Sequence, residues 1–171
     1  MIALSKKVCL LGDFAVGKTS LVRRFVYNLF EDKYISTIGV KVSRKVLAIP
    51  RTSDVVELTL MLWDLAGSEE FDQVRTSYLR GAAGAILVCD LTRPETLDSL
   101  RANAGHLRAA DPGIPLAIAA NKRDLTDQQR IAESQLAAAA AGLNAPYLLT
   151  SARTGDEVET LFRRLGRLLV A

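Results

Sequence analysis

The sequence has few of the residues that mark a cross-linked, metal-bound or membrane-spanning chain. Its two cysteines, Cys9 and Cys89, lie inside apolar runs and have neither CxxC nor Cys/His spacing. This pattern excludes a disulfide scaffold and a cysteine metal site, and it predicts two buried free thiols in a reducing compartment. The longest apolar run, residues 82–89, is far too short to span a bilayer.

An excess of one charge is also lacking. The 22 basic and 19 acidic side chains leave a net charge of +3, and no block of like charges forms a basic arm, so we expect no nucleic-acid partner. Ile2 rules out N-myristoylation, Lys6 and Lys7 interrupt any signal-like segment, and residues 169–171 include no cysteine for a lipid. We expect a monomeric cytoplasmic protein with no membrane anchor in this chain. It would reach a membrane only through partners or a missing tail.

The sequence does contain a regular alternation of strand-like and helix-like segments. Hydrophobic residues make up 49% of the 171 residues, which suits a single domain over residues 1–171. Such alternation predicts an α/β fold in which helices cover both faces of a mostly parallel sheet. Strands are expected at 7–11, 42–49, 55–63, 85–90, 116–120 and 147–150, and helices at 19–27, 69–81, 94–110, 128–141 and 157–170.

The segment GDFAVGKT, residues 12–19, fits the phosphate-loop pattern G-x-x-x-x-G-K-[ST] between a predicted strand and a predicted helix. Glycines let successive backbone N–H groups converge on phosphate, and the positive end of the helix points into the same space. Lys18 would place its charge between the β- and γ-phosphates, and the Thr19 hydroxyl would bind Mg²⁺. A chance glycine turn is the alternative, but the flanking elements favour a nucleoside-triphosphate site. The residues expected around the phosphates are Asp13, Phe14, Ala15, Val16, Gly17, Lys18, Thr19 and Ser20.

The segment Asn121-Lys122-Arg123-Asp124 follows the predicted strand 116–120. A carboxylate such as that of Asp124 can accept hydrogen bonds from N1–H and the exocyclic amine of guanine together, and adenine lacks this pair of donors. Alone, the four residues could equally be a solvated loop. Together with the phosphate loop they predict a site for a guanine nucleotide, GTP or GDP, with Mg²⁺.

Four further segments complete a resemblance: YISTIGV at 34–40, LWDLAGSE at 62–69, SYLRGA at 77–82 and TSAR at 150–153. With these motifs the chain resembles a small GTPase of the Ras superfamily, nearest to the Rab branch, from Lys7 to Leu169. The resemblance implies the G domain of a P-loop NTPase, with a six-stranded mostly parallel sheet and about five helices on both faces. It also implies protein effectors, GTPase-activating factors and exchange factors as partners.

The resemblance assigns roles in two switch segments, about 32–42 and 65–78. Thr37 resembles the threonine whose hydroxyl binds Mg²⁺ and whose backbone senses the γ-phosphate, although from the residues alone it is a polar loop residue. Asp64 resembles the carboxylate that holds Mg²⁺ through water, and Gly67 the glycine that offers its N–H to the γ-phosphate. A lone aspartate after a strand could equally cap a turn. The expected catalytic residues are Lys18, Thr37, Gly67 and Ser68, and the expected metal ligands are Thr19, Thr37 and Asp64.

The resemblance also places residues around the nucleotide. The segment Ser151-Ala152-Arg153 would support Asp124 and donate a backbone N–H to the guanine oxygen, and Lys122 would lay its stem across the base. Phe30 matches an aromatic residue that packs edge-on to guanine, with a core phenylalanine as the alternative. Tyr34 matches a residue that can close over the phosphates, with a surface tyrosine as the alternative.

Two residues depart from the family pattern. Ser68 stands where most of these proteins carry the glutamine that orients the attacking water, and a serine is too short for that task. Phe14 occupies a position that is commonly glycine or serine. Its ring would crowd an incoming arginine finger, displace water, or fold outward as part of a partner surface. The two departures together predict slow hydrolysis, and Glu69 or Glu70 is a weaker candidate for reaching the water.

Three functions compete on this evidence. The leading hypothesis is a guanine-nucleotide switch that slowly hydrolyses GTP and signals through its two switch segments. The second is a hydrolysis-deficient GTP-binding docking module, which Ser68 and Phe14 favour. The third is a P-loop kinase or ATPase, but the chain has no extra segment for an acceptor site or lid, and residues 121–124 argue for guanine.

Overall fold

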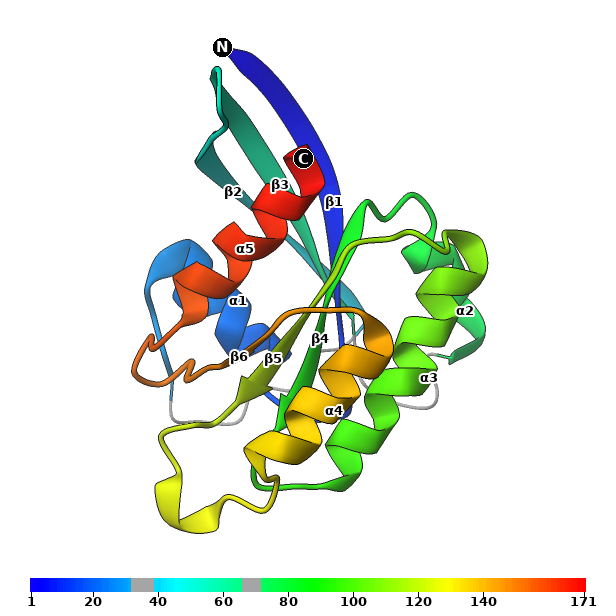
Figure 1. Cartoon of the computed structure of the whole chain (residues 1–171), viewed down its shortest axis with the longest axis vertical. Coiled ribbons are helices and arrows are strands. Elements are labelled where there is room, and N and C mark those ends of the chain that lie inside the picture. Colours follow the sequence, from blue (N-terminus) through cyan, green and yellow to red (C-terminus); the bar gives the residue numbers. More distant parts are fainter. Residues whose placement is uncertain (32–38, 66–71) are drawn as a thin grey trace.

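A six-stranded sheet forms the centre of the molecule (Figure 1). The structure is a computed structural model, and it describes residues 1–31, 39–65 and 72–171. The strand order is β2-β3-β1-β4-β5-β6, in which β2 runs antiparallel to β3 and the other neighbouring strands pair in parallel. The strands are β1 (Ile2–Leu11), β2 (Val40–Pro50), β3 (Val55–Leu65), β4 (Gly84–Asp90), β5 (Leu116–Asn121) and β6 (Tyr147–Leu149).

Helices cover both faces of this sheet, as the alternation of segments predicts. The side chains of α1 and α5 pack into one hydrophobic cluster, and those of α3 and α4 pack into another on the opposite face (Figure 1). The helices of the described residues are α1 (Lys18–Tyr27), α2 (Asp72–Leu79), α3 (Glu95–Ala110), α4 (Glu133–Leu143) and α5 (Val158–Val170), with a short 3₁₀ helix, η2, at Thr126–Gln128. The predicted α/β architecture is therefore confirmed.

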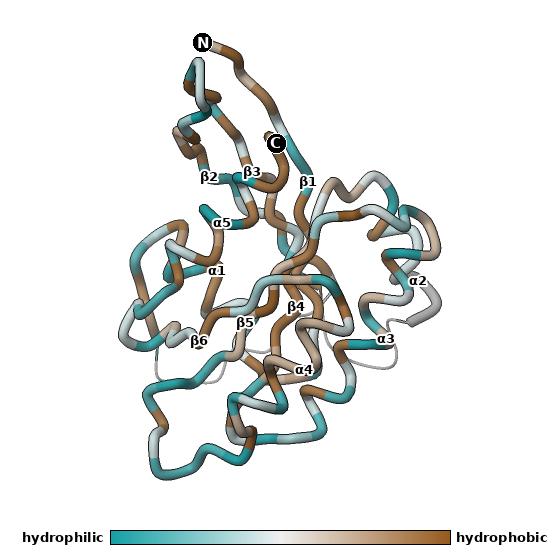
Figure 2. The backbone as a smooth tube through the Cα atoms, in the orientation of Figure 1, coloured by the Kyte–Doolittle hydropathy of each residue, from teal (hydrophilic) through white to brown (hydrophobic). Residues whose placement is uncertain are grey.

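The two faces follow from the period of two along each strand. In β1, Val8 and Leu10 pack into the cluster with α1 and α5, whereas Cys9 and Leu11 pack into the cluster with α3 and α4. Buried strands with helices on both sides read as continuous apolar runs. Figure 2 accordingly shows the central strands as mostly hydrophobic and the segment between β5 and α4 as mostly hydrophilic.

Single contacts hold each layer in place. On the α1 and α5 face, the rings of Phe25 and Phe162 stack with their centroids 4.0 Å apart.

The two cysteines, Cys9 and Cys89, lie in the hydrophobic cluster on the α3 and α4 face, and both are free and buried, as the sequence predicts. Burial raises the pKa of Cys9 to about 11 and that of Cys89 to about 12. No helix in the described part of the chain is long and apolar enough to cross a bilayer.

The boundaries of β1, α4 and α2 are among those that differ from the sequence-based prediction. Strand β1 begins at Ile2 rather than residue 7, because the long β2–β3 hairpin offers residues 2–6 a pairing edge, although residues 2, 3 and 5 stay exposed. Helix α4 begins at Glu133 rather than residue 128. The backbone N–H groups of Arg130 and Ile131 donate instead to the carbonyl of Leu91, at 2.8 and 3.2 Å, which holds this stretch out of a helix. Helix α2 ends at Leu79 rather than residue 81, and its expected start at residue 69 lies outside the described residues.

Candidate functional site

The candidate residues gather at one edge of the sheet, where the parallel strands end. Gly12 follows β1, Asp64 is the penultimate residue of β3, and Asn121 is the last residue of β5. Ligands of open α/β sheets bind outside the carboxyl ends of the strands. The sheet therefore brings motifs that are far apart in the sequence to a common edge.

The phosphate loop is tightly folded at its two glycines. A Cβ on Gly12 would overlap the carbonyl oxygen of Val88, and a Cβ on Gly17 would overlap the amide of Asn121. Gly17 also has a φ of 104°, which L residues rarely adopt, at the start of α1. Lys18 is buried within this loop, and its Nζ donates to the carbonyls of Gly12 at 2.9 Å and Asp13 at 3.1 Å. The ammonium group is thus fixed against the loop where phosphate is expected.

A hydroxyl and a carboxylate meet beside the loop. The Oγ1 atom of Thr19 donates to Oδ2 of the buried Asp64 at 2.5 Å, although 45 positions separate these residues. Mg²⁺ prefers oxygen ligands and in nucleotide sites is held by one or two protein oxygens, substrate phosphates and water. Among the described residues no group of three His, Cys, Asp or Glu side chains forms a metal cage. The donor set therefore fits Mg²⁺ held with a nucleotide rather than by protein alone.

Asn121 connects the phosphate loop to the segment that follows β6. Its Nδ2 donates to the carbonyl of Val16 at 3.1 Å. Its Oδ1 accepts from the Thr150 hydroxyl at 3.2 Å and from the backbone N–H of Ala152 at 3.3 Å. Asn121 is almost fully buried, so each of these polar contacts replaces water that the side chain has lost. The amide fixes three segments relative to one another.

The predicted support for Asp124 has a specific geometry in the structure. The Ser151 hydroxyl donates to Oδ1 of Asp124 at 2.8 Å, which leaves the other carboxylate oxygen for a ligand. Arg24 of α1 holds the same loop from behind, since it donates to the carbonyls of Ala152, at 2.8 Å, and of Arg153. The sequence analysis did not identify Arg24, because nothing in the local pattern of α1 links it to residues about 130 positions away.

A second aspartate, Asp90, was also missed. It ends β4 with a fully buried side chain, and its Oδ2 lies 3.0 Å from both Lys122 Nζ and Arg93 Nε. Its Oδ1 accepts from the backbone N–H of Thr92 at 2.9 Å and from the Thr92 hydroxyl at 2.7 Å. Burial alone would raise the pKa of Asp90, but the hydrogen bonds from Thr92, Lys122 and Arg93 outweigh it and hold that pKa below its ordinary value. The one signal for Asp90 in the sequence was the position of a carboxylate at the end of a predicted buried strand.

The remaining predicted residues divide into three groups. Phe14 has a side chain that is 53% exposed, so its ring is directed outward rather than buried within the loop. Phe30 is half-buried against the hydrophobic cluster of α1 and α5, Ser20 is half-buried on α1, and Ala15 has a left-handed φ of 62°. The predictions for Tyr34, Thr37, Gly67 and Ser68 fall outside the described residues.

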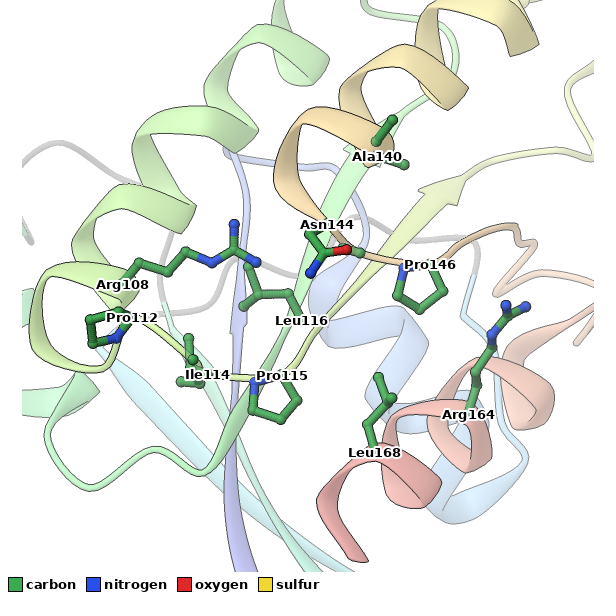
Figure 3. A pocket seen from close by; sticks show the side chains of 13 residues that line it. Arg108, Pro112, Ile114, Pro115, Leu116, Ala140, Asn144, Pro146, Arg164 and Leu168 are labelled. Atoms are coloured by element: carbon green, nitrogen blue, oxygen red, sulfur yellow. The ribbon is translucent and has the colours of Figure 1, made fainter. Parts of the chain in front are cut away.

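A separate cavity lies at the opposite edge of the sheet, near the start of β5. It has a volume of about 600 Å³, and Arg108, Asn144 and Arg164 line it together with apolar residues such as Leu116 (Figure 3). It contains neither the phosphate loop nor residues 121–124. We therefore do not place the nucleotide there.

Comparison with known proteins agrees with this geometry. Residues 7–171 match the Ras family. The GTP-binding protein ypt5 of Schizosaccharomyces pombe is 38% identical over 171 residues, which covers 99% of this chain and 80% of that protein. The Ras-related protein Rab-22A of Mus musculus is 37% identical, with 94% of this chain and 81% of that protein covered. The Ras-related protein Rab-4B of Rattus norvegicus is 34% identical, with coverage of 96% and 76%.

The family match spans far more than half of the chain, and the relatives are aligned over most of their own length. The chain therefore belongs to the Ras family, as a Rab-like small GTPase that binds GTP and GDP with Mg²⁺ and acts as a molecular switch.

Proposed function

We propose that this protein is a slow GTPase in which the residues at the carboxyl ends of the strands bind the nucleotide. One observation carries the assignment of the site. Thr19 of the phosphate loop and the buried Asp64 of β3 meet at 2.5 Å, and Lys18, the residue before Thr19, is fixed against carbonyls of the same loop. A metal ligand pair and a phosphate-binding cation at one place favour a nucleoside triphosphate with Mg²⁺.

Each end of the nucleotide has its own recognition residues in this proposal. Asp124, oriented by Ser151, would accept the two guanine donors and so discriminate against ATP. Lys18, held by two loop carbonyls, would stabilise the charge between the β- and γ-phosphates. Thr19 and Asp64 would hold Mg²⁺, which would supply positive charge to neutralise the phosphates.

Slow hydrolysis follows from a missing water-orienting group. Hydrolysis adds a water to the γ-phosphorus and breaks its bond to the β–γ bridging oxygen, with little covalent chemistry for the protein to do. The main contribution of the protein is then to position that water, and Ser68 is too short to replace glutamine in this task. Phe14, 53% exposed on the phosphate loop, adds a ring where an arginine finger from a partner would approach.

The same proposal includes the organisation and partners of the protein. Residues 1–171 act as one G domain, monomeric and cytoplasmic, whose partners are effectors, GTPase-activating factors and exchange factors. Membership of the family supports this class of partner. The second candidate function is a docking module that binds GTP without hydrolysing it, which the presence of Ser68 and the exposure of Phe14 favour.

Single-turnover hydrolysis of preloaded GTP tests the proposal. We expect the parent to hydrolyse GTP more slowly than about 10⁻⁴ s⁻¹, the order of unassisted Ras-type enzymes, and Ser68→Gln to be at least about tenfold faster. Ser134→Gln, at an exposed position of α4, is the matched control and should keep the parent's rate.

The outcomes separate the two candidate functions. A parent rate at or above about 10⁻⁴ s⁻¹ would show that Ser68 is not limiting, and another group must then position the water. A parent without measurable hydrolysis, in which Ser68→Gln also stays inactive, would favour the docking module. A parent that binds ATP as tightly as GTP in competition would remove the assignment of Asp124.

A further inference from the structure

We propose that Arg93 is a positioning residue that clamps the front of the phosphate loop and thereby slows nucleotide release. The inference rests on the proposed nucleotide site and adds a residue outside its sequence motifs. The Nη2 atom of Arg93 donates to the backbone carbonyl of Phe14 at 2.8 Å, although 79 positions separate the two residues. Arg93 thus contacts the phosphate loop directly.

The clamp acts on a strained part of the loop. Ala15, which shares a peptide group with Phe14, has a φ of 62°, and this left-handed conformation is unfavourable for a residue with a Cβ. Loops that alternate right- and left-handed residues gather N–H groups into an anion-binding concavity. A tether from outside is one way to keep such a strained peptide in place.

The direction of the tether matters for phosphate binding. In a trans peptide the carbonyl and the following N–H point in opposite directions. Because Arg93 fixes the carbonyl of Phe14, it also fixes the N–H of Ala15 so that it points away from Arg93. Loss of this hydrogen bond would let the peptide rotate and lose a donor to the phosphates.

Arg93 is itself anchored by the buried Asp90. Its Nε lies 3.0 Å from Asp90 Oδ2, so the two ends of the guanidinium group contact two different segments. Such a planar fork loses less freedom per hydrogen bond than a lysine would. A second tether from the same region is the Ser99 hydroxyl of α3, which donates to Oδ2 of Asp13 at 2.8 Å.

The rear of the loop is held differently. There Asn121 donates to the carbonyl of Val16 at 3.1 Å, from the segment that also carries Asp124. The hydrogen bond to Phe14 comes from Arg93, which precedes α3, and the hydrogen bond to Val16 comes from Asn121 at the end of β5. Removal of Arg93 should therefore weaken phosphate binding and leave base recognition unchanged.

Nucleotide release measures this effect. Fluorescent GDP bound with Mg²⁺ is chased with excess unlabelled GDP, and the dissociation rate is compared for the parent, Arg93→Ala and Arg93→Lys. We expect Arg93→Ala to release GDP about tenfold faster, which corresponds to about 1.4 kcal/mol. Arg93→Lys should also exceed the parent's rate, because one ammonium group cannot span both acceptors. The control Arg101→Ala, at an exposed position of α3, should match the parent.

A second ligand distinguishes the clamp from a general structural role. Inosine diphosphate lacks the exocyclic amine, so the ratio of its dissociation rate to that of GDP reports on base recognition. We expect Arg93→Ala to accelerate both nucleotides equally and leave this ratio unchanged. The proposal is overturned by a changed ratio, by Arg93→Ala or Arg93→Lys at the parent's rate, or by equal acceleration in Arg101→Ala. A parent that fails to bind labelled GDP would instead overturn the assignment of the nucleotide site.

Discussion

The base-recognition end of the site and its γ-phosphate end differ in how closely they keep the pattern of the family. At the base end, Asn121 and Ser151 are buried and connect the loops after β5 and β6 through hydrogen bonds of 2.8–3.3 Å. At the proposed γ-phosphate end, Phe14 is 53% exposed, and Ser68 stands where the resemblance implies a glutamine. On the proposed assignment, nucleotide binding and nucleotide hydrolysis are separable properties that depend on different residues.

The largest effect is expected from breaking the base end. Asp124→Ala removes a carboxylate that would accept two guanine donors, and charge-assisted hydrogen bonds contribute about 1.5–3 kcal/mol each. The affinity for GDP should fall by about 100-fold or more, and the preference for GTP over ATP should shrink, as measured by titration with fluorescent nucleotides. Asp127→Ala, at an exposed position of η2, is the control. Unchanged affinity in Asp124→Ala would place base recognition elsewhere.

An intermediate effect is expected at Asp90, which joins the two ends by contacting both Lys122 and Arg93. Asp90→Asn keeps the shape but cannot hold two cations, so the free energy of unfolding at pH 7 should fall by about 1–3 kcal/mol, the cost of leaving buried groups imperfectly paired. Urea denaturation with excess GDP and Mg²⁺ measures this change, with Asp98→Asn, exposed on α3, as the control.

The pH dependence of the Asp90 effect has a fixed sign. The pKa of Asp90 in the folded protein is lower than its ordinary value, so the carboxylate stabilises the fold above the unfolded pKa of about 3.9. That contribution is lost as the pH falls through the lowered pKa. The stability difference between the parent and Asp90→Asn should therefore be largest near neutral pH and narrow at acidic pH. A difference that stays constant down to pH about 3 would contradict this explanation.

The smallest effect is expected at the γ-phosphate end. Phe14→Ala removes the ring of a residue that is 53% exposed. The ring therefore buries little apolar surface on folding, and little hydrophobic stabilisation is lost with it. The free energy of unfolding should change by less than about 1 kcal/mol, and GDP affinity should stay within about threefold of the parent. Phe25→Ala, in the stacked pair on the α1 and α5 face, should destabilise the fold by about 3–5 kcal/mol in the same assay. A large loss of GDP affinity in Phe14→Ala would show that its ring supports the loop.

The sequence was most informative where function depends on backbone and residue type at a fixed spacing. The segments 12–19 and 121–124 predict a phosphate loop and a base-recognition loop, because the two patterns occur together and each follows a predicted strand. Asp90, Arg93 and Arg24 could not be found in this way. Each has a partner that is distant in the sequence, and the position of a charged residue at a strand end or in a helix does not by itself indicate that partner.

The same distinction holds for the fold. Alternating apolar runs and amphipathic helices determined the order of strands and helices, since hydrophobic periodicity is local. Tertiary contacts decided where two of these elements begin. The β2–β3 hairpin recruited residues 2–6 into β1, and the carbonyl of Leu91 held Arg130 and Ile131 out of α4.

The sequence by itself thus determined the fold class and the nucleotide, and it predicts the departures at Phe14 and Ser68. Only the tertiary structure decided that Asp64 meets Thr19, that Asn121 joins three segments, and that Arg93 holds the phosphate loop. The physical reason is that a parallel sheet aligns the ends of strands that are far apart along the chain. Hydrogen bonds between those ends depend on three-dimensional placement, which no local pattern encodes.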